Sequence, residues 1–312
     1  MPADHRDYAA SPRLWLAHRL AQCRRIPLRG MGLLFRLGEG ILPVPPPGAL
    51  CLIRTLHGFR MLVDPVEDRG LEVALFRQGT YEHGTLSFIQ RVLRPGDVFL
   101  DVGANIGLMS LCAAAALRGT GKVMSFEPMP ATFEILTRNI RLNPFSNIEA
   151  FNLALGAEDA SLEMFDSLAS KRGAASLIRP EGAAPGRRVE IRRLDDVLAE
   201  HAIGRVACFK LDVEGWELEA LKGATRLLSS PDAPLCIVEC SKLHPMQGGT
   251  IADLYRLMRQ INAYRVFRLE RGKDFPSALV EIHDEPSLPA HDNIFCLLPR
   301  HLETLPRTMI QG

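Results

Sequence analysis

The sequence contains little lysine and carries almost no net charge. Its 37 basic and 36 acidic residues give a net charge of +1 at pH 7, and all but six of the basic residues are arginines. Proteins that bind nucleic acids through the phosphate backbone present a clear excess of positive charge. The composition therefore argues against a nucleic-acid partner. The six lysines are Lys122, Lys171, Lys210, Lys222, Lys242 and Lys273.

Long apolar runs and paired cysteines are also missing. The apolar run at residues 108–117 is much shorter than the roughly 20 residues that span a bilayer. The N-terminus has no continuous apolar stretch of the kind found in signal peptides. The seven cysteines are odd in number and form no Cys-x-x-Cys pair, which argues against a disulfide framework. We therefore expect no transmembrane segment and a reducing, cytoplasmic setting.

The composition changes along the chain and predicts four regions. Residues 1–48 form an arginine-rich helical arm that ends in the proline-rich linker "LPVPPPGA". Residues 49–96 combine a β-hairpin around His57-Gly58 with helical pieces that lead into the core. Residues 97–300 form the core, and residues 301–312 form a C-terminal tail.

The arm has three interpretations. Seven arginines face only two aspartates over the first 36 residues, which is typical of an arm that docks on an acidic partner or a membrane surface. The arm could also hold two copies of the chain together. Because its helical periodicity is weak, we favour ordinary helices that pack on the main domain.

From residue 97 onward, predicted strands alternate with predicted helices. This alternation indicates a mostly parallel sheet with helices on both faces, an α/β fold. Small hairpins are expected at "SLEMF" and "RRVEIRRL", beside a loop at 166–187. The predicted strands are 98–102, 122–126, 148–154, 206–211, 235–240, 264–269 and 293–298, and the predicted helices are 107–117, 130–142, 194–201, 215–228 and 250–262.

The segment "VFLDVGANIGLMSL" contains a glycine turn between the first strand of the core and a helix. Gly103 and Gly107 allow the backbone to turn sharply and to approach a ligand at the helix N-terminus. The spacing departs from the dinucleotide fingerprint G-x-G-x-x-G, and no lysine follows as in a phosphate-binding loop. Asp101, directly before the turn, would repel a pyrophosphate and favours a ligand with a cationic group.

Two more acids end predicted strands. Glu127 follows the second strand, where a carboxylate accepts hydrogen bonds from ribose hydroxyls. Together with Asp101 and the glycine turn, it fits S-adenosylmethionine better than NAD. Asp212 ends the fourth strand in "FKLDVEGWELEALKGA", across the crevice from Asp101, although Asp212 and Glu214 could simply cap the next helix.

Several motifs in this order resemble the FkbM-type methyltransferases. They are "LDVGANIGLMSL", "FEPMPATFEILTRNIRLN", "NLALG", "LDD" and "FKLDVEGWELEALKGA", with "GTYEHGTLSFIQRVLRPGD" upstream and "DNIFCLLP" at the end. The resemblance covers roughly residues 60–298. It implies the Rossmann-like class I methyltransferase fold, with a seven-stranded, mostly parallel sheet, and S-adenosylmethionine as cofactor.

The resemblance also implies roles for individual residues. The glycine turn would line the methionine and ribose part of the cofactor, and Glu127 would bind the ribose hydroxyls. Asp212 would lie near the sulfonium and the acceptor, which in this family is mostly a hydroxyl group of a sugar or of a secondary metabolite. The residues of the turn are Asp101, Gly103, Asn105 and Gly107, and those flanking the adenine would be Asn152, Ala154 and Leu155.

Methyl transfer to a hydroxyl needs a base, because an alcohol is a poor nucleophile. The candidates are Asp212, Glu239 at the end of "CIVEC", and His244 in "SKLHP". A magnesium ion held by Asp212 and another carboxylate could replace the base. Two alternatives stay open: an NAD(P)-dependent oxidoreductase of similar architecture, and a non-catalytic protein that only binds the cofactor.

Overall fold

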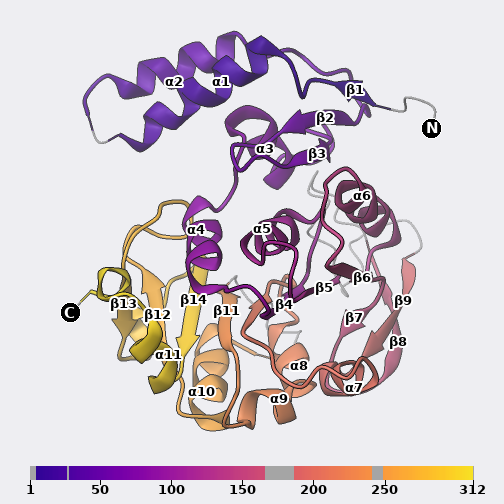
Figure 1. The fold of residues 1–312 in the computed structure, drawn as a ribbon, viewed down its shortest axis with the longest axis vertical. Coiled ribbons are helices and arrows are strands. Elements are labelled where there is room, and N and C mark those ends of the chain that lie inside the picture. The colour runs from indigo at the N-terminus through magenta and orange to yellow at the C-terminus, as the bar shows by residue number, and fades with distance from the viewer. Residues whose placement is uncertain (1–4, 27, 166–185, 241–248, 312) are drawn as a thin grey trace.

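A large twisted sheet forms the centre of the molecule (Figure 1). The computed structural model describes residues 5–26, 28–165, 186–240 and 249–311. Within them the main sheet has eight strands in the order β13-β12-β14-β11-β10-β4-β5-β6. The strands from β6 to β11 run parallel, and β14 is antiparallel to both of its neighbours. This is the mostly parallel sheet that the alternating pattern predicts.

The seven predicted core strands are confirmed, and one edge strand was missed. The short segment "LVEI" forms β13, which pairs antiparallel with β12 and adds an eighth strand at the edge of the sheet. The strands of the main sheet are β4 (Val98–Val102), β5 (Lys122–Phe126), β6 (Ile148–Phe151), β10 (Cys208–Leu211), β11 (Leu235–Cys240), β12 (Arg265–Leu269), β13 (Leu279–Ile282) and β14 (Asp292–Leu297).

Successive residues of each central strand enter two separate cores. In β4, Phe99 packs with helices α4, α5 and α6, whereas Leu100 packs with α7, α8, α9 and α10 on the other face. A sheet covered on both faces needs apolar residues at every position, which explains the continuous apolar runs in the sequence. Figure 1 shows these two groups of helices on opposite sides of the sheet.

The helices agree with the predicted ones, with one division. The predicted helix 215–228 is two short helices, α8 and α9, which meet at Gly223. No helix among the described residues has both the length and the apolar character needed to cross a membrane. The helices are α1 (Pro12–Gln22), α2 (Met31–Gly40), α3 (Leu71–Gln78), α4 (His83–Val92), α5 (Leu108–Ala116), α6 (Pro130–Arg141), α7 (Leu194–Glu200), α8 (Glu217–Lys222), α9 (Thr225–Ser229), α10 (Ile251–Ile261) and α11 (Pro299–Thr304).

Two small sheets flank the core. The first has the order β1-β2-β3 and contains the predicted hairpin, whose turn includes Gly58 at φ +88°. The second has the order β7-β9-β8 and contains the predicted side hairpin. Their strands are β1 (Arg6–Asp7), β2 (Cys51–Arg54), β3 (Arg60–Val63), β7 (Ala154–Leu155), β8 (Ala160–Met164) and β9 (Arg187–Arg192).

The N-terminal arm is attached to the core through β1 and α1. Strand β1 pairs with β2, and α1 buries Leu14, Ala17 and His18. The imidazole Nε2 of His18 lies 2.9 Å from the carbonyl oxygen of Phe76 in α3. This is the packed arrangement favoured from the sequence. The arm packs on the core even though a proline-rich linker follows it.

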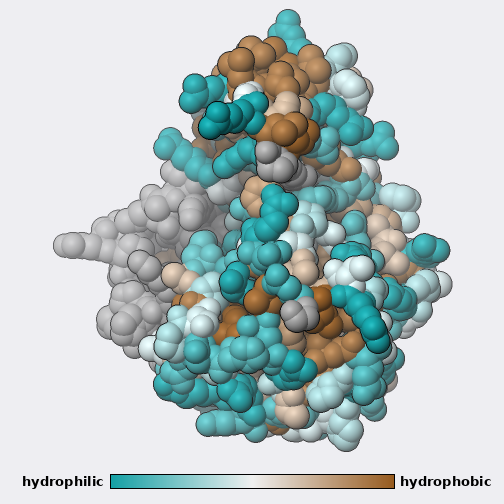
Figure 2. Space-filling model, turned by 90° about the vertical axis from the view of Figure 1, so that its left-hand side faces the viewer, coloured by the Kyte–Doolittle hydropathy of each residue, from teal (hydrophilic) through white to brown (hydrophobic). Residues whose placement is uncertain are grey.

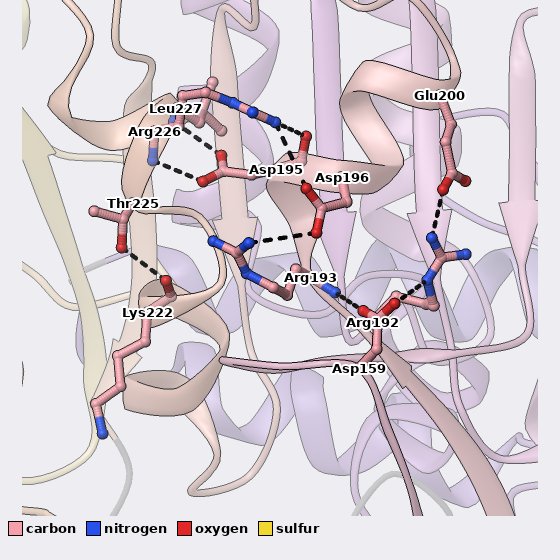
Figure 3. Close-up of polar contacts among 10 residues, drawn as sticks. All are labelled: Asp159, Arg192, Arg193, Asp195, Asp196, Glu200, Lys222, Thr225, Arg226 and Leu227. Carbon is pink, nitrogen blue, oxygen red and sulfur yellow. Dashed lines mark hydrogen bonds and ion pairs between the residues drawn. The ribbon is translucent and has the colours of Figure 1, made fainter.

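The pair of acids in "LDD" has a structural explanation (Figure 3). The carboxylate of Asp195, buried in α7, accepts hydrogen bonds from the backbone N–H groups of Arg226 at 2.7 Å and Leu227 at 2.9 Å. These are free N–H groups in the first turn of α9, so Asp195 caps a helix that is distant in sequence. Asp196, by contrast, lies partly exposed and forms surface ion pairs with Arg193 and Arg226.

We predict that Asp195→Ala lowers the free energy of unfolding by about 1–2 kcal/mol, because two backbone donors at the start of α9 lose their capping acceptor. The matched control is Asp196→Ala, which removes only exposed ion pairs and should cost about 0.5 kcal/mol or less. Urea unfolding of both variants provides the comparison. Equal losses of stability would show that Asp195 does not hold α9.

Candidate active site

A deep cavity lies at the carboxyl ends of the central strands. It encloses about 1420 Å³ of space, part of it open to solvent. The strand order reverses between β4 and β10, and in open parallel sheets ligands bind at such a reversal. Seven of the residues proposed from the sequence line this cavity: Gly103, Asn105, Glu127, Ala154, Leu155, Asp212 and Glu239.

The glycine turn forms the floor of the cavity through a close contact with the end of β10. Gly103 has φ +79°, and a Cβ placed on it would lie 1.7 Å from the carbonyl oxygen of Asp212. The N–H groups of Gly103 and Ala104 both donate to the carbonyl of Phe126, at 3.0 and 2.9 Å. Glycine is therefore required here for packing of the two strand ends, in addition to any closeness to a ligand.

Asn105 and Glu127 form a polar wall of the cavity. The backbone N–H of Asn105 donates to Oε2 of Glu127 at 2.9 Å, and the N–H of Met129 donates to Oε1 at 2.9 Å. Burial raises the pKa of Glu127 to about 7, although these two N–H groups oppose the rise. Each carboxylate oxygen keeps a second lone pair for a ligand hydroxyl. The side-chain Oδ1 of Asn105 is buried and has no hydrogen-bond partner among the described residues.

Three of the proposed cofactor residues do not line the cavity. Asp101 lies beneath the turn, where its carboxylate accepts a hydrogen bond from Ser110, and burial raises its pKa to about 6. A Cβ on Gly107 would lie 2.7 Å from Leu136, so this glycine is needed for helix packing. Asn152 donates to the carbonyls of Glu127 and Pro128, both at 2.9 Å. The structure therefore gives these residues a supporting position behind the wall.

Asp212 reaches the cavity from the end of β10 and is held by a buried lysine. Lys210 Nζ lies 2.9 Å from Oδ2 of Asp212, and the lysine side chain is almost completely buried in the strand. The backbone turn that follows is fixed by Glu217, whose Oε1 accepts from the N–H groups of Val213 and Gly215. Asp212 is thus free of the capping role that the sequence left open.

A second buried cluster adjoins Asp212. Lys273, in the loop between β12 and β13, lies 2.8 Å from Glu82 and 2.7 Å from Glu239. Glu82 adopts a left-handed backbone conformation at the start of α4, and its Oε2 accepts from Asn293 at 2.8 Å. Carboxylate oxygens of Glu82, Asp212 and Glu239 all lie within 4.8 Å of one another. Three carboxylates and two ammonium groups therefore meet at one end of the cavity.

The crowding of carboxylates moves their pKa values apart. Burial, together with repulsion from Asp212, raises the pKa of Glu239. Burial alone would also raise the pKa of Asp212, but attraction by Lys210 and a hydrogen bond with Glu239 lower it. Two carboxyl groups that are hydrogen-bonded to each other share a proton, as in other carboxylate pairs. Glu239 can therefore act as a base only after it has released this shared proton.

The cluster does not suit magnesium. Lys210 and Lys273 already place ammonium groups 2.7 to 2.9 Å from the three carboxylates. A divalent cation would meet two buried positive charges at the point where it needs oxygen ligands. The two lysines thus occupy the positions that a metal ion would need.

Several residues of the site are not among the candidates proposed from the sequence. Tyr81, Glu82 and Trp216 line the cavity, and Lys210 and Lys273 fix its carboxylates. A signal for Lys210 was present, because a lysine within the apolar strand "ACFKL" needs a carboxylate partner. His244 and the loop 166–185 lie outside the described residues.

The strand order, with antiparallel β14 inserted between β11 and β12, and the acid at the end of β5 define the Rossmann-like architecture of class I methyltransferases. The Methyltransferase FkbM domain matches residues 101–269, more than half of the chain. The chain belongs to this family, as the motifs in its sequence suggested.

Three methyltransferases are similar in sequence to this chain. The chain is 31% identical over 159 residues to Methyltransferase sdnD of Sordaria araneosa, which is 41% of this chain and 61% of that protein. It is 28% identical over 229 residues to the hexuronic acid methyltransferase AglP of Haloferax volcanii, covering 72% and 87% of the two chains. It is also 28% identical over 194 residues to the 31-O-demethyl-FK506 methyltransferase FkbM of Streptomyces tacrolimicus, covering 54% and 72%.

We predict that Gly103→Ala destabilises the protein by at least about 2 kcal/mol more than Gly96→Ala, because only the first places a methyl group against a strand end. Gly96 is the matched control: its φ is +92°, but a Cβ there would have no neighbour within 4 Å. Thermal and urea unfolding measure both. If the two variants lose the same stability, the contact between Gly103 and Asp212 is not tight in solution.

Proposed function

We propose that this chain is an S-adenosylmethionine-dependent methyltransferase that acts on a hydroxyl oxygen. The observation that carries the proposal is the pairing of two ends within one cavity. One end holds Asn105 and Glu127, and the other holds the cluster of Asp212, Glu239 and Glu82 with its two lysines. A cofactor with a ribose fits the first end, and an acceptor whose proton must be removed fits the second.

The first end suits S-adenosylmethionine in three respects. Glu127 offers two carboxylate oxygens for the ribose hydroxyls, and the unpartnered Oδ1 of Asn105 offers an acceptor for an amine or a hydroxyl. Ala154 and Leu155 present apolar surface beside Phe126, where a flat adenine would be sheltered from water. When bound, the cofactor would supply an electrophilic methyl group on a sulfonium.

At the second end, the chain holds the acceptor hydroxyl and takes its proton. Glu239 is our candidate base, because its raised pKa gives it a stronger affinity for a proton than an ordinary carboxylate has. Asp212, fixed by Lys210, holds the protonated form of Glu239 in place through their hydrogen bond. Lys273 neutralises the carboxylate that Glu239 forms after it loses its proton. His244 stays a further candidate.

The acceptor class follows from the relatives and is proposed only as a class. One relative is a hexuronic acid methyltransferase, and another methylates 31-O-demethyl-FK506. We propose a sugar, a glycan or a secondary metabolite as the acceptor. The cytoplasmic setting expected from the sequence stays a prediction, as does an oligomer formed through the arm.

Glu127→Gln should weaken binding of S-adenosylmethionine by about 1.5–3 kcal/mol, because hydrogen bonds to a charged acceptor are lost. In the wild type, affinity should also fall as the pH drops below about 7, where Glu127 takes up a proton. Isothermal titration calorimetry across pH measures both effects, with NAD as the competing ligand.

The matched control is Glu149→Gln, which changes a glutamate in β6 that pairs with Lys122 at 2.7 Å, away from the cavity. It should bind the cofactor as the wild type does. Unchanged affinity in Glu127→Gln would remove Glu127 from the ribose site, and tight binding of NAD instead would favour an oxidoreductase.

Glu239→Gln should lower turnover roughly a hundredfold or more while cofactor affinity changes little, since a general base contributes about that factor. In the wild type, the rate should rise with pH through the raised pKa of Glu239, because only the deprotonated carboxylate can accept the proton. The variant should lose this dependence. Release of S-adenosylhomocysteine with a hydroxylated acceptor, found by screening sugars and metabolites, provides the assay.

Two comparisons make this result specific. Asp212→Asn should lower turnover but keep a rise of rate with pH. If Asp212→Asn instead loses this rise and Glu239→Gln keeps it, Asp212 is the base. Wild-type turnover should survive exhaustive chelation. Activity that is lost to a chelator and restored by magnesium would contradict the metal-free arrangement.

A further inference from the structure

The helical hairpin formed by α1 and α2 exposes large apolar side chains on its outer side. Trp15 is 60% exposed, Leu28 is 67%, Leu33 is 62% and Leu37 is 53%. Figure 2 shows hydrophobic surface gathered at the top of the molecule, where Figure 1 places this hairpin, with hydrophilic side chains around it. We call this surface the apolar face of the arm; it consists of Trp15, Leu16, Ile26, Leu28, Leu33 and Leu37.

The core of the protein does not account for these side chains. Helix α1 uses one side, with Leu14, Ala17 and His18, to pack on the core. In α2 the only buried residue is Gly38, which lies against Leu20 and Ala17 of α1. Leu33 and Leu37 of α2 are therefore left uncovered by the described part of the chain. Exposed apolar surface of this extent marks an interaction site.

The charges beside this face have one sign. Residues 12–40 contain six arginines and a single acid, Glu39, whose carboxylate lies 3.3 Å from Arg77 of α3. Within the described part of the chain, none of the exposed arginines of the hairpin has a carboxylate partner at its surface. Two of them lie over aromatic rings instead: Arg19 over Trp15 at 5.6 Å and Arg24 over Phe35 at 5.4 Å. The exposed arginines are Arg13, Arg19, Arg24, Arg29 and Arg36.

We propose that the apolar face of the arm docks the protein on an anionic lipid surface. A helix with a tryptophan and leucines on one side and arginines beside them lies in the membrane interface: the apolar groups enter the acyl boundary and the guanidinium groups meet lipid phosphates. The short hairpin fits this role because it lies on the surface without spanning the bilayer. Docking is separate from the proposed reaction and needs no cofactor.

The charge pattern favours lipid over a second copy of the chain. A symmetric dimer would place the same patch against itself and bring the arginines of both copies together without acids between them. A bilayer rich in anionic lipid supplies the opposite charge over the same area. The arm therefore matches a membrane surface in both hydrophobicity and sign.

Flotation of the full-length protein with lipid vesicles tests the proposal. Wild type should float with vesicles that contain phosphatidylglycerol and should remain unbound with vesicles of pure phosphatidylcholine. High salt should weaken the binding, because the attraction between arginine and lipid is screened. In a Trp216→Phe background, Trp15 is the only tryptophan of the chain, and its fluorescence should shift to shorter wavelength when vesicles are added.

Variants on the two parts of the surface separate their contributions. Leu33→Ser/Leu37→Ser should reduce vesicle binding about tenfold or more by removing exposed apolar groups. Arg13→Gln/Arg36→Gln should reduce it roughly fivefold per arginine. The matched controls are Leu162→Ser, which changes an exposed leucine of β8, and Arg141→Gln, which changes an exposed arginine at the end of α6; both should bind as the wild type does. Circular dichroism confirms that each variant is folded.

Two results would overturn the proposal. The first is a wild type that fails to bind anionic vesicles at low salt, or that binds them equally after both double substitutions. The second is a concentration-dependent dimer, seen by analytical ultracentrifugation, that dissociates in Leu33→Ser/Leu37→Ser while vesicles have no effect. That outcome would make the apolar face an interface between two copies of the chain.

Discussion

The contact between Gly103 and the carbonyl of Asp212 brings the ends of β4 and β10 together, and the site depends on it. Any side chain at Gly103 would collide with that carbonyl, at 1.7 Å from the expected Cβ. Because the strand order reverses between these two strands, their ends border the crevice from both sides. The turn then carries Asn105 to Glu127, and the end of β10 carries Asp212 to Glu239. One close backbone approach thus positions both ends of the cavity.

The second constraint is electrostatic. Three carboxylates from separate elements meet here: Glu82, Asp212 and Glu239. The positive charges of two lysines offset the repulsion among them. Burial and repulsion from Asp212 raise the pKa of Glu239, whereas attraction by Lys210 and a hydrogen bond with Glu239 together outweigh burial and lower the pKa of Asp212. Inequality of this kind assigns distinct roles to chemically similar groups. A buried cluster of charges is costly to maintain, which supports the proposed catalytic role over cofactor binding alone.

The sequence predicted the fold well because apolar periodicity and strand-ending acids are local signals. All seven central strands, the glycine turn, Glu127 and Asp212 were found in this way. The sequence could not show that Asp101 turns away to Ser110, since the direction of a side chain beneath a turn is decided by packing. It missed β13, which is four residues long, and Lys273 and Glu82, which reach the site from loops far apart in the chain. It left several interpretations of the arm open. The structure shows that one side of α1 packs on the core and that the outer side of the hairpin is exposed.

The most direct test of the central claim is a crystal structure of the full chain with S-adenosylhomocysteine. We expect the ribose hydroxyls on the carboxylate of Glu127, the adenine beside Leu155, and the sulfur directed toward Asp212 and Glu239. Density for the ligand elsewhere on the protein, or a cavity that stays empty at saturating concentration, would contradict the account.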